Sequence, residues 1–165
     1  MRDEEFEELY AEHAPPLFRF LVYRTGDRAL SEDLLADAFE RALRARSRFD
    51  PRRASGKTWL YAIALNCLRD HARRRDAEAR ALDRMGAPDA GGGPDALAAV
   101  ADRDQVMVAL ASLSEEEREA IALRFGADLT VPEIARLQDE KLTTIEGRVY
   151  RALRKLRGVI EPDAG

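Results

Sequence analysis

Residues 59–75 (WLYAIALNCLRDHARRR) constrain the fold most, because their apolar side chains recur with the period of an α-helix. One face of this predicted helix is apolar and comprises Leu60, Ile63, Ala64, Cys67 and Leu68. The other faces carry an amide and three guanidinium groups, from Asn66, Arg69, Arg73 and Arg74. A helix that buries one side and offers such donors on the other suits a nucleic-acid groove. The pattern therefore predicts a core-packed helix with a nucleic-acid-binding face.

The composition predicts an all-α protein. Good helix formers dominate the 165 residues, above all Ala, Leu, Arg and Glu, whereas β-branched residues are scarce. With 45% hydrophobic residues, the chain suits one domain or two small helical domains with separate cores.

Charge is distributed unevenly along the chain, although the net charge is only −4. Acidic side chains gather within residues 3–8 and 115–117, and basic ones within residues 41–57 and 69–75. The negative net charge disfavours a protein that coats nucleic acid indiscriminately. Separate acidic and basic surfaces instead favour a chain with both a protein partner and a nucleic-acid partner.

The chain lacks the residue sets of a disulfide framework or a metal centre. Its single cysteine, Cys67, cannot pair internally, and His13 and His71 have no thiol or carboxylate company suited to a metal. We therefore expect no cofactor, no bound metal and no small-molecule substrate. No apolar run approaches the roughly twenty residues of a membrane span, and no signal peptide opens the chain. The expected location is the cytoplasm, without membrane insertion.

Proline and glycine residues predict where helices begin and end in the first part of the chain. Pro15 and Pro16 are expected to end the first helix and open a second, because proline is best tolerated in a first helical turn. Gly26 followed by Asp27 predicts a helix end and then an N-cap. The next helix has a broad apolar face within residues 30–43.

Two segments read as connections. Residues 47–58 (SRFDPRRASGKT) combine proline, glycine and cations and predict a loop, and residues 86–94 (GAPDAGGGP) predict a flexible linker. We therefore expect an N-terminal domain over residues 1–76, a linker over residues 77–101 and a C-terminal domain over residues 102–160.

Capping-box spacing marks the C-terminal domain. Three hydroxyl residues are followed three positions later by a glutamate and predict helix starts: Ser114 with Glu117, Thr130 with Glu133, and Thr143 with Glu146. The last two starts define a short helix, a tight turn and a basic helix. This layout is typical of a helix-turn-helix.

Several segments in register carry a family resemblance. They are GDRALSEDLLADAF (residues 26–39), RFDP (48–51), the segment 59–75, LSEEEREAIALRF (113–125) and residues 133–157. In order and spacing the chain resembles the extracytoplasmic-function (ECF) group of bacterial RNA polymerase sigma factors, within the sigma-70 family. The resemblance implies an N-terminal helical bundle that opens promoters and a C-terminal helix-turn-helix domain.

The resemblance also implies a function without enzymatic activity. An alternative sigma factor directs core RNA polymerase to specific promoters and initiates DNA opening, under the control of an anti-sigma factor. Polymerase binding falls on one helix and its acidic face, at Asp33, Leu34, Asp37, Phe39 and Glu40. Promoter DNA is the second partner, with the minus-ten element opened by the first domain and the minus-thirty-five element read by the second.

DNA-binding candidates follow from chemistry and from the resemblance together. Aromatic rings and cations near one loop supply what capture of an unstacked base requires: Phe49, Arg52, Arg53, Lys57, Trp59 and Tyr61. The resemblance places Asn66 at the minus-ten edge, Arg73, Arg74 and Arg75 at backbone phosphate, and Arg148 and Arg151 on the DNA side of the terminal helix. Arg69 and Thr144 complete the set.

The turn before the last helix departs from the family pattern, which has leucine, glycine, an apolar residue and a small hydroxyl residue. Here those places hold Gln138, Asp139, Glu140 and Lys141. Aspartate can adopt the left-handed conformation that glycine would supply. Two carboxylates there, with Glu146 in the terminal helix, would repel phosphate.

Other interpretations stay open at this point. Trp59 could be a core residue, whereas Tyr61 is expected to be exposed, and the arginines of residues 73–75 could be a solvated helix end stabilised by the dipole. The acidic turn favours an alternative function, a sigma-like decoy that binds an anti-sigma factor without competent promoter recognition. A metal-dependent nuclease is disfavoured, because the carboxylates line helix faces without His or Cys partners.

Overall fold

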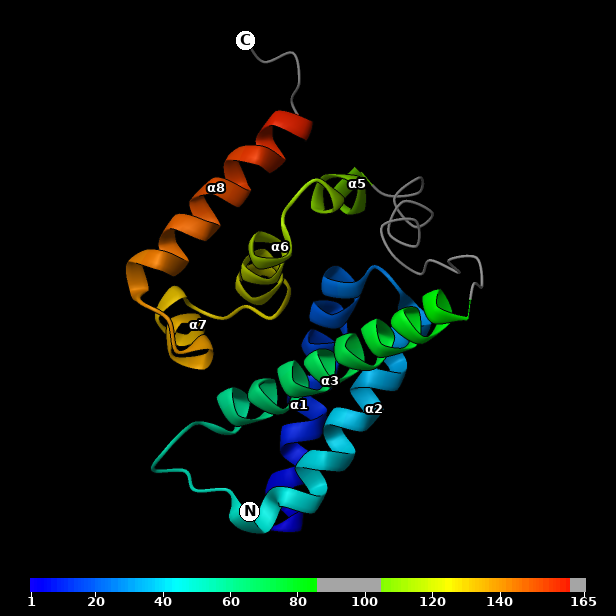
Figure 1. Ribbon diagram of the computed structural model, residues 1–165. Coiled ribbons are helices and arrows are strands. Elements are labelled where there is room, and N and C mark those ends of the chain that lie inside the picture. Colours follow the sequence, from blue (N-terminus) through cyan, green and yellow to red (C-terminus); the bar gives the residue numbers. More distant parts are fainter. Residues whose placement is uncertain (86–104, 161–165) are drawn as a thin grey trace.

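The computed structural model describes residues 1–85 and 105–160, and within these ranges the chain forms helices and no strands (Figure 1). The elements are α1 (Asp3–Thr25), α2 (Arg28–Ala45), the 3₁₀ turn η1 (Arg46–Arg48), α3 (Gly56–Arg84), α5 (Gln105–Ala111), α6 (Glu115–Ile121), the π-helical turn η2 (Ala122–Gly126), α7 (Val131–Gln138) and α8 (Leu142–Ile160). The all-α fold predicted from the sequence is confirmed.

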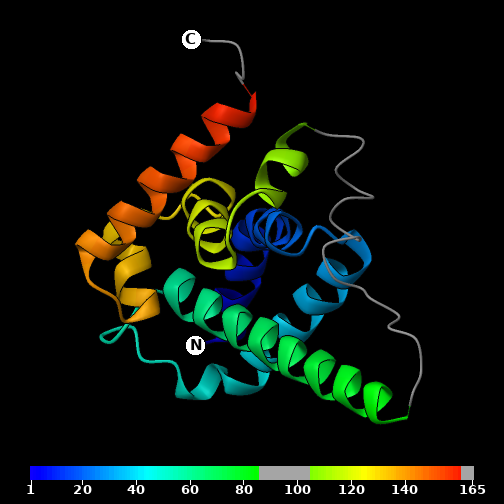
Figure 2. The same ribbon diagram turned by 45° about the horizontal axis from the view of Figure 1, so that its top comes forward.

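Helices α1, α2 and α3 form an N-terminal bundle. α1 and α2 pack side by side, and α3 packs across α2 and α1 (Figures 1 and 2). The core between them includes Phe20 and Leu21 of α1 with Leu60 and Tyr61 of α3, all fully buried.

Helix α1 runs without a break through Pro15 and Pro16, so the predicted interruption is wrong. Proline removes a backbone donor and crowds the preceding turn, which normally kinks or ends a helix. Here buried residues follow directly, beginning with the fully buried Leu17. Their packing against α2 and α3 stabilises the second half of α1 and offsets the local cost.

The boundary between α1 and α2 is as predicted. Gly26 takes a left-handed conformation with φ of 68°, and its amide donates to the Val22 carbonyl at 2.7 Å. Asp27 caps the next helix, because its carboxylate accepts from the amide of Leu30 at 3.0 Å.

Helix α3 continues beyond the predicted domain boundary. The expected linker began at residue 77, whereas residues 77–84 (AEARALDR) are helical and exposed and project from the bundle (Figure 2). This part of the prediction is wrong, because the segment consists mainly of good helix formers and lacks proline and glycine. The predicted linker residues 86–101 lie outside the described ranges.

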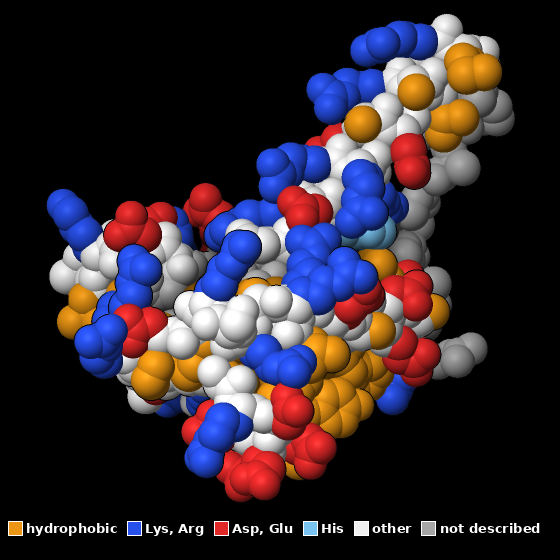
Figure 3. All heavy atoms as spheres, turned by 90° about the horizontal axis from the view of Figure 1, so that it is seen from below, with side chains coloured by type: hydrophobic (Ala, Val, Ile, Leu, Met, Phe, Trp, Pro, Cys, Tyr) orange, Lys and Arg blue, Asp and Glu red, His pale blue; other side chains and the backbone are white. Residues whose placement is uncertain are grey.

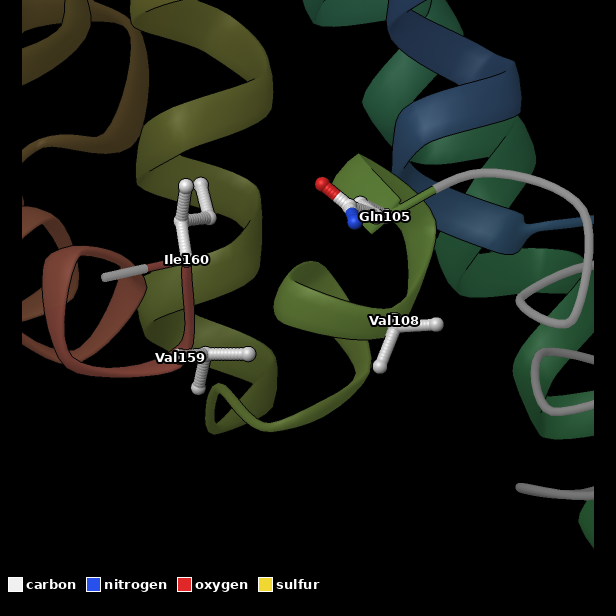
Figure 4. Close-up of a pocket in the computed structure, with 4 residues that line it drawn as sticks. All are labelled: Gln105, Val108, Val159 and Ile160. Carbon is white, nitrogen blue, oxygen red and sulfur yellow. The ribbon is translucent and has the colours of Figure 1, made fainter. Parts of the chain in front are cut away.

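Helices α5 to α8 form the C-terminal part, which is fastened by a buried arginine. The Arg118 guanidinium donates to the carbonyls of Leu110 at 3.1 Å and Leu113 at 3.2 Å, which ties α6 to the end of α5. α5 and the end of α8 leave a hollow of about 240 Å³ between them (Figure 4). Its lining residues are Gln105, Val108, Val159 and Ile160.

One of the three predicted capping boxes is complete and a second forms only its N-cap hydrogen bond. Ser114 accepts from the amide of Glu117 at 3.2 Å, and Thr130 and Glu133 accept reciprocally from each other's amides. The third is wrong, because α8 already begins at Leu142. The amide of Thr144 there donates to the Lys141 carbonyl instead.

The two parts of the chain contact each other where α1 meets α6 and η2 and where α3 meets α7. Gly126 lies against α1 so closely that a Cβ there would stand 3.3 Å from the Cα of Phe20 and 3.1 Å from the Tyr23 ring. Beside it, Arg19 Nε donates to the Gly126 carbonyl at 2.9 Å. Arg24 Nε lies 3.5 Å from a carboxylate oxygen of Glu119. The buried side chains of both parts form one contiguous cluster.

The hydroxyl of Tyr61 generates a stability prediction. It is buried and has no hydrogen-bond partner among the described residues. Tyr61→Phe removes an unpaired polar group that folding must desolvate, so we expect the free energy of unfolding to rise by about 1 kcal/mol. Chemical denaturation measures this change. Tyr10→Phe, which alters a half-exposed ring, is the control and should change stability little; a loss of stability in Tyr61→Phe would contradict the prediction.

Candidate nucleic-acid interface

A cationic loop joins η1 to α3. Arg52 and Arg53 are exposed, and Asp50 shapes the turn by accepting from the amide of Arg52 at 2.9 Å and from its guanidinium at 3.2 Å. These hydrogen bonds from Arg52 hold the pKa of the Asp50 carboxyl below its usual value. Ser55 then caps α3, because its hydroxyl accepts from the amide of Thr58 at 3.1 Å. The loop therefore presents its cations on an ordered backbone.

Two aromatic rings lie at the base of this loop. The rings of Phe49 and Trp59 are 5.0 Å apart between centroids and inclined at 50°. Both residues are half-buried, and Trp59 also packs against the core. Trp59 is thus partly a core residue and partly accessible beside the cations.

The outer face of α3 carries the amide and guanidinium groups that the periodicity predicts. Asn66 is exposed, and its side-chain oxygen accepts from Arg69 at 3.4 Å. Further along the helix, Arg73, Arg74 and Arg75 are exposed. Figure 3 shows Lys and Arg side chains gathered at the base of the projecting end of α3 and along it.

A chain of ion pairs fastens α2 to α3 beneath these arginines. Arg41 pairs with Asp37 at 3.0 Å and with Asp70 at 2.7 Å, and Asp70 also pairs with Arg73 at 2.8 Å. The hydrogen bond from Arg41 lowers the pKa of the Asp70 carboxyl. Arg73 is therefore oriented by a carboxylate that a second arginine holds in place.

The candidates on α2 divide into surface and core residues. Asp33 and Glu40 are exposed and Asp37 is half-buried, which gives this helix an acidic face. Leu34 and Phe39 are only 5% and 6% exposed, so the expectation that they contact a partner directly is corrected. Both fall on the apolar face of α2, and the Phe39 ring packs edge-on against Phe6 and Tyr10.

The prediction for Tyr61 is also wrong. It was expected to be exposed near the loop, but it is 0% exposed and packs edge-on against Phe20, 5.8 Å between ring centroids. Burial raises the pKa of its hydroxyl. Tyr61 therefore cannot stack on a base in this structure. The spacing of Tyr61 with Ala64 and Leu65, at i, i+3 and i+4, was a signal for burial.

The cations of the last helix differ in their surroundings. Arg151 is exposed, and Thr144 is half-buried. The side chain of Arg148 is only 15% exposed and lies between two carboxylates, at 3.1 Å from Glu140 and 3.7 Å from Glu116. The guanidinium of Arg148 is therefore paired within the protein. In the preceding turn Asp139 takes the left-handed conformation, with φ of 52°.

Lys57 connects the loop region to the C-terminal part. Its ammonium group donates to the carbonyl of Asp128 at 3.3 Å. Three contributors to the contact between the two parts were missed from the sequence, namely Arg19, Arg24 and Gly126. Arginines isolated on α1 carry no local signal for such a role, because their partners lie about a hundred residues away.

Nothing in the described residues supports a thiol or metal site. Cys67 is buried, and desolvation raises the pKa of its thiol to about 11, so the group is protonated at neutral pH. Within residues 1–85 and 105–160, no three His, Cys, Asp or Glu side chains converge as a metal site would require. In the same ranges, no helix is both long enough and apolar enough to cross a membrane.

Comparison with known families accounts for most of the chain. Residues 9–78 match Sigma-70 region 2, and residues 103–156 match Sigma-70, region 4. The ECF RNA polymerase sigma factor RpoE of Cereibacter sphaeroides is 34% identical over 161 residues, covering 94% of this chain and 87% of that protein. SigL of Mycobacterium tuberculosis, also an ECF sigma factor, is 31% identical, covering 90% and 85%.

A third relative is longer than this chain. The ECF sigma factor BldN of Streptomyces coelicolor is 29% identical over 164 residues, and the match spans 98% of this chain but 62% of BldN.

Solved structures share the fold. CnrH, solved in complex with the cytosolic domain of CnrY, is 26% identical with a TM-score of 0.71, covering 99% of this chain and 92% of that one. The sigma factor RpoE from Bartonella quintana, solved in complex with the anti-sigma factor NepR, has a TM-score of 0.78 over 97% and 99% of the two chains, and at 24% identity it supports the fold alone. With both sigma regions matched in order and relatives above 30% identity, the chain belongs to the ECF RNA polymerase sigma factors of the sigma-70 family.

Proposed function

We propose that this chain is an alternative sigma factor that directs core RNA polymerase to specific promoters and initiates DNA opening. The observation that carries the proposal is the juxtaposition at the start of α3. An exposed cationic loop with two aromatic rings at its base leads directly into a helix whose outer face presents Asn66 and a row of arginines. The chain acts in complex with the polymerase and needs no catalytic residue of its own.

Promoter opening by this surface is a matter of differential binding. Extruding a base costs a few kcal/mol of unstacking, and an aromatic ring that stacks on it returns roughly 1–3 kcal/mol. Phe49 and Trp59 supply the rings. The exposed Arg52 and Arg53 hold the phosphates of the separated strand, with Arg52 exchanging its ion pair with Asp50 for a phosphate contact.

Polymerase binding is assigned to the acidic face of α2. Asp33, Asp37 and Glu40 lie on this face, away from the buried Leu34 and Phe39 that hold the helix on the bundle. The ion pairs of Arg41 with Asp37 and Asp70 connect this helix to α3. The polymerase-binding face and the DNA-binding face are thus parts of one rigid bundle.

Control by an anti-sigma factor is the second part of the proposal. The ECF family to which the chain belongs supports this expectation, and the 26% identical CnrH was solved in complex with the cytosolic domain of a second protein, CnrY. An anti-sigma factor that engages this chain would compete with the polymerase for it.

The direct test is transcription reconstituted from purified parts. Full chain is added to bacterial core RNA polymerase with a pool of promoter fragments, and new transcripts are mapped. We expect transcripts with defined start sites that core enzyme alone does not produce. Core binding without any such transcript would favour the decoy function, and failure to bind core would contradict the polymerase-binding part of the proposal.

Asn66 and Asp33 provide a reciprocal pair of variants. Asn66→Ala removes a base-edge contact, so we expect promoter opening to fall about tenfold while affinity for core polymerase is unchanged. Asp33→Asn should lower core affinity and leave opening unchanged once the polymerase is saturated. Permanganate reactivity measures opening, and fluorescence anisotropy measures core binding. Equal loss of both activities in Asn66→Ala would show that Asn66 is misassigned.

Arg53 supplies a test of phosphate contact by the loop. Its guanidinium is exposed and forms no ion pair among the described residues, so it is available to phosphate. Arg53→Gln should weaken holoenzyme binding similarly at every promoter and reduce the slope of log affinity against log salt by about one. Arg2→Gln removes an exposed cation at the far N-terminus and serves as the control, with no change of slope expected. An unchanged slope in Arg53→Gln would exclude a phosphate contact.

A further inference from the structure

The two arginines of α8 that were expected to face DNA are held in different ways. Arg148 is largely covered, and both ion pairs of its guanidinium are internal, to Glu140 and Glu116. Arg151, three residues on, is exposed and makes no hydrogen bond or ion pair with any residue in the described ranges. Only one of these two cations is free to meet a phosphate or a base.

The partners of Arg148 come from two other elements of the C-terminal part. Glu116 lies in the first turn of α6, and Glu140 lies in the turn between α7 and α8. That turn is itself fixed, because the amide of Glu140 donates to the Ala135 carbonyl at 2.9 Å while Asp139 takes its left-handed conformation. Arg148 therefore connects α8 both to α6 and to the turn between α7 and α8.

A second ion pair and the apolar core complete the attachment of α8. Lys155 pairs with Glu117 of α6 at 2.8 Å, two turns beyond Arg148. Between these levels Val149 and Ala152 are buried. The rotation of the helix about its axis is thereby set by contacts on its inner side.

The outer side of α8 is correspondingly open. Tyr150 is 67% exposed. The Arg151 guanidinium lies back over Gly147, where a Cβ would stand 3.1 Å from its Nη1 atom. Gly147 thus leaves room for the Arg151 guanidinium.

We propose that Arg148 is a positioning residue, clamped by Glu140 and Glu116, and that Arg151 is the arginine of α8 that contacts the minus-thirty-five DNA. The inference rests on the proposed sigma-factor function. It gives the acidic turn a role, because the Glu140 carboxylate neutralises Arg148 and fixes the helix that reads the groove. To reach phosphate, Arg148 would have to give up two ion pairs with partly exposed carboxylates, whereas Arg151 would give up none.

The test compares Arg148→Gln with its matched variant Arg151→Gln, each in the full chain bound to core polymerase. The probe is a pool of promoter duplexes randomised over the minus-thirty-five region. Arg151→Gln should lower affinity about tenfold and reduce the salt slope by about one, with an unchanged thermal midpoint. Arg148→Gln should keep the salt slope, lower the thermal midpoint and broaden the selected sequence, which separates positioning from a purely structural role.

A charge exchange provides the second measurement. Arg148→Glu alone should lose thermal stability and sequence selection, and adding Glu140→Arg should restore both to within about threefold in affinity. A residue that contacts phosphate directly could not be rescued in this way, so failure of the well-folded double variant to recover selection would overturn the inference. So would a fall in salt slope for Arg148→Gln equal to that for Arg151→Gln. If the unmodified chain selects no sequence, the proposed function itself fails, while the thermal midpoints still decide whether Arg148 clamps α8.

Discussion

Burial of one face of α3 is the constraint on which the N-terminal surfaces depend. Leu60, Ala64 and Cys67 are fully buried against α1 and α2, and burial of apolar surface at roughly 25 cal/mol per Å² makes any rotation of the helix costly. A helix held on one side must present its other side outward. The position of Asn66 and the arginines is therefore a consequence of the core, and the cationic loop is placed by the helix it caps.

Arginines in this protein fall into two groups that differ in their partners. Arg118 and Arg148 are largely covered and Arg41 is partly covered, and each joins helices through carboxylates or carbonyls. Arg53 and Arg151 are exposed and have no such partners in the part of the chain described. A covered guanidinium that is already paired gains little from a phosphate, because the exchange leaves its carboxylate partner unpaired. The covered, paired arginines thus connect helices, and the exposed ones define the surfaces open to nucleic acid.

Local pattern predicted the fold well and the long-range contacts poorly. Periodicity and capping residues located α2, α3 and α7, and the glycine–aspartate pair located the boundary at Gly26. The prolines of α1 misled, because packing on both sides of them outweighs a local penalty that propensity alone reports. Leu34, Phe39 and Tyr61 were assigned to surfaces by motif position, although their helical spacing already placed them in the core. Arg148 could not be judged at all, since its partner Glu116 lies thirty-two positions away in the sequence.

The hydrogen bond from Lys57 to the Asp128 carbonyl has a thermodynamic consequence. An ammonium group that sits against a carbonyl of the C-terminal part cannot at the same moment neutralise a phosphate with the same donors. Lys57 can therefore either bind the C-terminal part or bind a DNA strand, and the two interactions compete. By reciprocity, each makes the other less favourable by the same amount. A DNA strand that binds Lys57 weakens the contact between the two parts of the chain. A stronger contact between the parts, in turn, lowers the affinity for the strand.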